Sequence, residues 1–107
     1  MEFFELSSLE VEHQVKGGLF LQFLSKERLS VGLYKLKAGE LDPQKPHTED
    51  EVYYVLRGNA LIRVGTEKQD VKPGSIIYVA AGVDHKFNDI KEDLEILVFF
   101  APAHTPS

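Results

Sequence analysis

Short runs of alternating or β-branched apolar residues follow one another along the chain and predict strands. In residues 29–36, apolar residues alternate with small or polar ones over the first half, which is the two-residue period of a strand. Further runs rich in Val, Ile, Tyr or Phe occupy residues 51–56, 60–64, 68–71, 76–79 and 94–100, and residues 19–24 are another candidate strand. No stretch has the apolar spacing of a convincing amphipathic helix.

Glycine and proline separate these runs and suggest the fold class. Residues 65–67, Gly-Thr-Glu, lie between two runs and predict a hairpin, while Gly32 inside a run predicts a close backbone approach or a bulge. Many short strands with turn signals between them predict an all-β antiparallel sandwich or barrel. We expect a single domain over residues 1–107, with residues 102–107 as a frayed tail.

Composition and charge narrow the classes of function. The 107 residues are 43% hydrophobic and 27% charged, which is usual for a soluble globular protein. The net charge is −5 and the basic residues are scattered, so a nucleic-acid partner is not expected. The lack of cysteine excludes disulfides, thiolate metal sites and a Cys nucleophile. The apolar runs are too short to span a bilayer and the acidic start does not look like a signal peptide, so we expect a cytoplasmic protein without membrane contact.

Two histidines and a glutamate stand in patterned surroundings. His47 precedes Glu51 by four residues, and in an extended chain residues an even number apart share a face. His85 begins a short run containing Phe87, and a barrel can bring it beside this pair. A buried carboxylate is costly without a partner, and imidazole with carboxylate suits a first-row metal such as Fe, Mn, Zn, Ni or Cu. Taken singly, each residue also fits an ordinary surface or core position.

The offsets around these residues match two motifs. Residues 39–58 follow the order Gly, five residues, His-any-His, three or four residues, Glu, six residues, Gly, with Lys45 at the first His. Residues 74–88 follow the order Gly, five residues, Pro-any-Gly, two residues, His and a nearby Asn, with Ala80 at the proline. Both motifs resemble those of the cupin superfamily, in particular its small single-domain bacterial-type members. The motifs and their flanking strands cover roughly residues 29–100.

The resemblance implies a fold and a metal site. The fold would be the cupin double-stranded β-helix, a jelly-roll antiparallel barrel, and the ligands of a divalent transition metal (Fe, Mn, Zn or Ni) would be His47, Glu51 and His85. A family member with every motif position would add a third imidazole, where this chain has Lys45. An ammonium is a poor ligand at neutral pH, because it has no free lone pair.

Three arrangements follow from Lys45. The metal is held by three protein ligands and water, or Gln44 supplies a carbonyl oxygen as a fourth ligand, or Lys45 itself pairs with Glu51 in a metal-free site. If a metal is bound, we expect Lys45 to point outward, toward the acidic rim at Glu49 and Asp50, because its charge would repel the ion.

The resemblance leaves several functions open. One is an enzyme of dioxygenase, isomerase or decarboxylase type acting on a small polar molecule, with no catalytic residue identified. Another is a non-catalytic module that binds or senses a small molecule, and a third is a metal-free domain that serves oligomerisation. The resemblance also implies a homodimer, since small cupins commonly pair through edge strands.

A few further side chains are candidates for the pocket or the surface. Residues that could line a pocket beside the metal are Tyr34, Lys45, Tyr53, Arg63 and Phe87. The aromatic members of this set are equally typical of a barrel core, and Arg63 could reach solvent instead. His13 and His104 lie outside both motifs, so we expect them on the surface.

Overall fold

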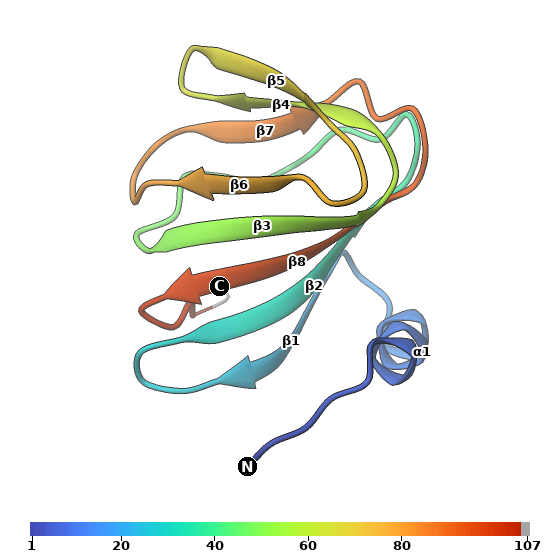
Figure 1. The fold of residues 1–107 in the computed structure, drawn as a ribbon, viewed down its shortest axis with the longest axis vertical. Coiled ribbons are helices and arrows are strands. Elements are labelled where there is room, and N and C mark those ends of the chain that lie inside the picture. The colour runs from blue at the N-terminus through green and yellow to red at the C-terminus, as the bar shows by residue number, and fades with distance from the viewer. Residues whose placement is uncertain (106–107) are drawn as a thin grey trace.

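The strands of this protein form two antiparallel sheets that face each other (Figure 1). A computed structural model describes residues 1–105. The elements are α1 (Leu6–Lys16), β1 (Phe20–Ser25), β2 (Ser30–Leu36), β3 (Asp50–Arg57), β4 (Ala60–Val64), β5 (Glu67–Val71), β6 (Ile76–Val79), β7 (His85–Asn88) and β8 (Leu94–Ala101). The larger sheet has five strands in the order β1-β2-β8-β3-β6, and the smaller has three in the order β5-β4-β7. The predicted all-β antiparallel fold is confirmed.

The predicted strands all form, with ends that differ by at most one residue. Their alternation puts one face of each sheet into a shared core. In β3, for example, Tyr53 and Val55 are fully buried while Tyr54 between them is exposed. Tyr53 meets Phe87 of the smaller sheet, with ring centroids 5.1 Å apart. Burying a large apolar side chain contributes about 1.5–3 kcal/mol, so this interface is what holds the two sheets together.

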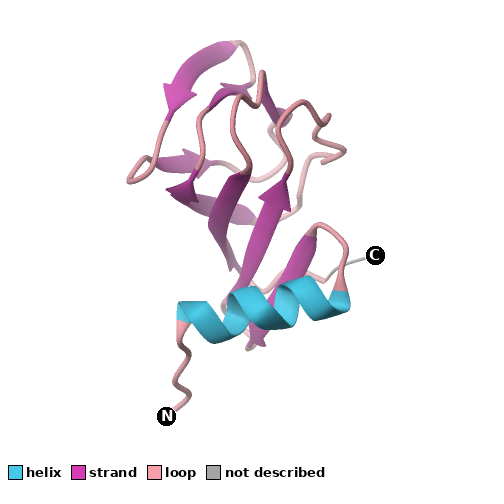
Figure 2. Cartoon of the chain, turned by 90° about the vertical axis from the view of Figure 1, so that its right-hand side faces the viewer, coloured by secondary structure: helices cyan, strands magenta, loops and turns pink. Residues whose placement is uncertain are grey.

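The helix α1 was not predicted, and the absence of a helix signal is explained by its exposed valines. Val11 and Val15 are 61% and 82% exposed, so its apolar residues do not share one face. The buried side chains are Leu9 and His13, and α1 lies across the outer face of the larger sheet near β1 and β2 (Figure 2). The expectation that His13 is a surface residue is wrong, since its Nε2 lies 2.9 Å from the Leu19 carbonyl oxygen. No helix in residues 1–105 is long and apolar enough to cross a membrane.

The structure shows both features expected at Gly32, a close approach to the backbone and a bulge. A Cβ at this position would collide with the ring of Phe20, which packs directly over the Gly32 backbone. The register between β1 and β2 also shifts between Gln22 and Leu24, next to the Gln22–Gly32 pair. The side-chain-free glycine therefore lets Phe20 fold inward at a bulge in the neighbouring strand.

The segment after β8 contacts the larger sheet and the loop before β3 through His104. In its described part, residues 102–105, the His104 backbone N–H donates to Ser30 Oγ at 2.8 Å, and its Nδ1 lies 2.9 Å from Glu49 Oε1. The His104 ring also stacks on Phe100, at 4.5 Å between centroids. His104 is thus half-buried and not the exposed residue expected, whereas the frayed tail stays a prediction, and residues 106–107 lie outside the described residues.

Candidate metal centre

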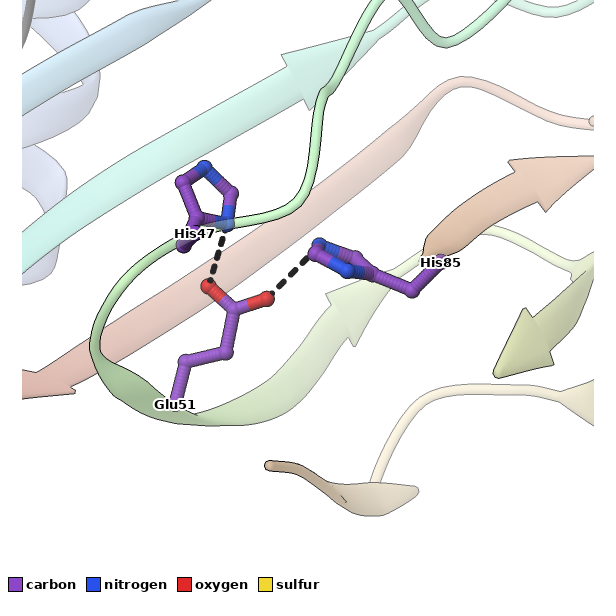
Figure 3. Close-up of side chains that lie close together, drawn as sticks. All are labelled: His47, Glu51 and His85. Atoms are coloured by element: carbon purple, nitrogen blue, oxygen red, sulfur yellow. Dashed lines mark ion pairs between the residues drawn. The ribbon is translucent and has the colours of Figure 1, made fainter. Parts of the chain in front are cut away.

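Three separate parts of the chain bring His47, Glu51 and His85 together (Figure 3). Glu51 is the second residue of β3, and the alternation of that strand points it into the core. His85 is the first residue of β7, in the opposite sheet. His47 comes from the loop before β3, and its carbonyl oxygen accepts a hydrogen bond from the Gly82 N–H at 2.7 Å. This bond ties the two motif segments to each other, so the centre spans both sheets.

The three side chains meet at the Glu51 carboxylate. His47 Nδ1 lies 3.2 Å from Glu51 Oε2, and His85 Nε2 lies 2.8 Å from Glu51 Oε1. One ligand atom from each residue lies within 4.8 Å of the other two. Glu51 is 2% exposed and His85 is fully buried, so water barely screens these contacts.

A backbone carbonyl determines the tautomer of His85. Its Nδ1 lies 2.9 Å from the Val83 carbonyl oxygen, which can only accept a hydrogen bond. The proton of a neutral His85 is therefore on Nδ1, and Nε2 presents a lone pair to Glu51. Histidines that bind metals commonly donate their other N–H in this way.

The electrostatics of the centre favour an ionised Glu51. Burial alone would raise the pKa of the Glu51 carboxyl, but its polar contacts with His47, His85 and Tyr53 lower that pKa to about 2. Burial alone would lower the pKa of the His85 imidazole, but its contacts with Glu51 and the Val83 carbonyl raise that pKa above its usual value. The carboxylate thus needs a cation beside it, which is either a proton on His85 or a metal ion.

The donor atoms fit a divalent transition metal. His47 Nδ1, Glu51 Oε2 and His85 Nε2 are all buried, and within residues 1–105 none makes a hydrogen bond of acceptable direction despite lying so close together. Converging donor atoms that no hydrogen bond satisfies are what a cation would satisfy. Two imidazoles and one carboxylate form the donor set of non-haem Fe(II) sites and also suit other first-row metals.

A buried hydrogen-bond network that the sequence did not reveal supports the centre. The Tyr53 hydroxyl lies 2.7 Å from Glu51 Oε1 and 2.9 Å from Gln44 Oε1. Gln44 Nε2 donates to Asp42 Oδ2 at 2.7 Å. Asp42 is only 4% exposed and also accepts hydrogen bonds from the Tyr34 hydroxyl and the Phe87 N–H. Asp42 lies in a segment rich in Gly and Pro, two residues after the exposed Glu40, so nothing in the sequence marked it as buried.

A cavity of about 710 Å³ opens beside the centre. Its walls combine apolar and polar side chains, among them Phe20, Tyr34, Gln44, Lys45, His47, Phe100 and His104. Of the three candidate ligands, His47 alone lines it. Another hollow, of about 780 Å³, lies at Asn59–Leu61 and β5 and contains none of the three, so the first cavity is the relevant one.

The predicted pocket residues divide into three groups. Tyr34 and Lys45 line the cavity, whereas Tyr53 and Phe87 are buried in the core behind it. Arg63 does not reach the cavity, because its guanidinium bonds to the Gly65 carbonyl at 3.0 Å and to Asp84 at 3.2 Å. Arg63 occupies an outward position of β4, so of the two alternatives left open for Arg63, the surface fits these contacts and the pocket does not.

The position of Lys45 settles one of the three arrangements considered. Lys45 is exposed, as expected, and within the described residues it forms no ion pair with Glu51. It forms none with Glu49 or Asp50 either; Glu49 contacts His104, and Asp50 accepts a hydrogen bond from the Ala81 N–H. The arrangement in which Lys45 fills the centre is therefore not the one found.

Comparison with known proteins places this geometry in a family. A sequence profile of the cupin domain matches residues 32–100, which span both motifs and both sheets. The chain belongs to the cupin family. Among its relatives, the uncharacterised protein SCO3923 of Streptomyces coelicolor is 53% identical over 102 residues, covering 95% of this chain and 97% of that protein.

Solved structures agree on the fold of this cupin. TT1209 from Thermus thermophilus is 30% identical, with a TM-score of 0.78 over 95% of this chain and 98% of that one. An RmlC-like cupin from Methanocaldococcus jannaschii, described as a double-stranded β-helix, is 21% identical, with a TM-score of 0.71 over 79% and 80% of the two chains. The predicted cupin double-stranded β-helix is confirmed.

Proposed function

We propose that this cupin holds one divalent transition metal at His47, Glu51 and His85 and acts on a small polar molecule bound in the adjoining cavity. The observation that carries the proposal is the convergence of three buried lone-pair atoms that lack hydrogen bonds. A proton on His85 would satisfy only one of these contacts, whereas a divalent ion would satisfy all three.

The residues around the cavity suit a small polar ligand. Phe20 and Phe100 provide apolar walls, while Tyr34, Gln44 and His47 provide groups that bind oxygen or nitrogen atoms. When bound, the metal would act as a Lewis acid toward an oxygen of the substrate. The enclosed centre excludes water, which strengthens each electrostatic contact within it. The reactions that the family resemblance offers are those of a dioxygenase, an isomerase or a decarboxylase.

One observation favours a non-catalytic alternative. Glu51 and His85 are almost completely buried, and the cavity reaches the centre only at His47. A metal enclosed in this way could stabilise a binding or sensing module without turning over a substrate. Access of a substrate oxygen to the metal would distinguish the two functions.

Calorimetric titration of chelator-treated protein with Zn²⁺, Mn²⁺, Ni²⁺ and Fe²⁺ tests the metal site. We expect one ion per chain, and a drop in affinity of well over about tenfold in His85→Ala, because that variant loses one of three ligands. Asp84→Asn is the matched control, since the adjacent Asp84 side chain is 55% exposed and pairs with Arg63.

Two results would oppose the proposal. If no ion binds more tightly than about 100 μM, the metal site fails. If metal binds but O₂ consumption and product formation are absent with a panel of diols and 1,3-diketones, the non-catalytic alternative is favoured.

A further inference from the structure

Gln44 and Lys45 point in different directions beside the centre. Lys45 stands where the family motif has its first imidazole, but it is exposed and does not reach Glu51. Gln44 is half-buried, and its side chain is directed toward Tyr53, whose hydroxyl bonds to Glu51. The chain therefore presents an amide rather than an ammonium on the inner side of this segment.

Asp42 determines which end of the Gln44 amide faces the centre. A buried carboxylate attracts an NH₂ group and repels a carbonyl oxygen, so the Gln44 Nε2 must be the atom 2.7 Å from Asp42 Oδ2. Asp42 itself lies in the loop between β2 and β3. It accepts hydrogen bonds from the Tyr34 hydroxyl of β2 at 2.6 Å and from the Phe87 N–H of β7 at 2.9 Å. The amide is thereby fixed with its Oε1 toward the Tyr53 hydroxyl, which bonds to Glu51.

The Tyr53 hydroxyl has one proton for two acceptors. Glu51 Oε1 is charged and lies at 2.7 Å, whereas Gln44 Oε1 is neutral and lies at 2.9 Å. A charged acceptor forms the stronger bond, so the proton belongs to Glu51. No other donor to Gln44 Oε1 is found among residues 1–105, so this oriented carbonyl oxygen keeps a lone pair to offer, one hydroxyl group away from the Glu51 carboxylate.

We propose that Gln44 Oε1 is the fourth protein ligand of the metal, held in orientation by Asp42, and that it replaces the imidazole lost at Lys45. This inference rests on the proposed metal site. Amide carbonyl oxygens are suitable ligands for hard and borderline divalent ions, and a fourth ligand from the cavity side completes a centre whose other three ligands come from the loop, β3 and β7.

Titration of chelator-treated protein with Co²⁺ tests the assignment. Gln44→Ala is expected to bind Co²⁺ at least about tenfold more weakly than the wild type, and to change the visible absorption spectrum of the saturated Co²⁺ form. Leu41→Ala is the matched control, since it alters a residue of the same segment that is 90% exposed and does not line the cavity, and we expect its affinity and its spectrum to stay as in the wild type.

The possible results distinguish a failure of the Gln44 assignment from a failure of the metal site itself. If the wild type binds Co²⁺ and Gln44→Ala binds it equally well, the ligand assignment is overturned while the three-residue metal site stands. If Gln44→Ala binds more weakly but its saturated spectrum is unchanged, Gln44 acts only through Tyr53, and the assignment is again overturned. If the wild type binds no Co²⁺, Zn²⁺ or Mn²⁺, the proposed function itself has failed. Melting of the metal-free variants identifies any loss of fold.

Discussion

The hydroxyl of Tyr53 links the candidate ligands to the rest of the core. It donates to Glu51 from within the same strand, two residues away, because residues i and i+2 of β3 share the inner face. A buried carboxylate costs several kcal/mol unless charged or hydrogen-bonded groups offset its desolvation, so this bond matters both for folding and for the metal.

Tyr53→Phe removes the hydroxyl and leaves the ring in place. We expect the free energy of unfolding of the metal-free protein to fall by about 1.5–3 kcal/mol, the usual value of a hydrogen bond to a charged group. We also expect metal affinity to fall by about tenfold or more, as for other groups that orient ligands. Urea denaturation and calorimetry measure the two effects. Tyr54→Phe, on the exposed face of the same strand, should change neither, and equal effects in both variants would contradict this account.

At the scale of the elements, two glycines have almost the same φ but different surroundings. Comparing them separates the cost of a left-handed backbone from the cost of a steric clash. Gly58, between β3 and β4, has a φ of +93°, and Gly74, before β6, has a φ of +94°. A Cβ on Gly58 would lie 2.5 Å from the Asp93 carbonyl oxygen, whereas nothing lies within 4 Å of a Cβ on Gly74. The motif glycine at 58 is thus required because the turn packs against the start of β8.

Gly74→Ala should cost only the strain of a left-handed backbone, about 1–2 kcal/mol in the free energy of unfolding. Gly58→Ala should cost that amount and about 1–3 kcal/mol more, because the backbone at Asp93 must shift. Denaturant unfolding of both variants measures the difference. If the two variants are equally stable, the close approach at Gly58 has no energetic weight.

Several elements and one site could be predicted from local patterns, and others could not. The strands follow from alternation and glycine spacing, and His47, Glu51 and His85 follow from fixed motif offsets. The helix α1 could not be predicted, because its burial depends on the sheet that it covers and not on its own pattern of apolar residues. The buried contacts of Asp42 and His104 could not be predicted for a related reason. Their partners, Phe87 and Ser30, are far away in sequence.

At the scale of the whole molecule, homodimerisation stays a prediction. The edge strand β6 exposes Ile76 and Tyr78, at 72% and 61%, and the adjacent strand exposes Tyr54 at 39%. Apolar side chains on an edge strand favour contact with a second sheet. Sedimentation at tens of micromolar should give a dimer, and Tyr78→Lys should shift it toward monomer. A clean wild-type monomer would exclude the homodimer.

Stability and metal affinity of the whole protein should respond to pH in opposite directions. In the metal-free protein the pKa of His85 is raised above 6.5, so its stabilising contribution is complete below that value and is lost as pH rises through the raised pKa. The pKa of Glu51 is lowered from 4.5 to about 2, so its contribution is constant at neutral pH and is lost as the pH falls from about 4.5 through about 2. The free energy of unfolding in the presence of a chelator should therefore fall as the pH rises above about 6.5.

With Zn²⁺ present the sign reverses, because a metal competes with protons for the imidazoles and its affinity rises over the same interval. Urea denaturation at several pH values, with chelator and with saturating Zn²⁺, measures both curves. Glu51→Gln is the control, since it removes the carboxylate that holds the proton on His85 and should flatten the chelator curve. A chelator curve that has the same slope in the wild type and in Glu51→Gln would mean that His85 and Glu51 do not share a proton in the metal-free protein.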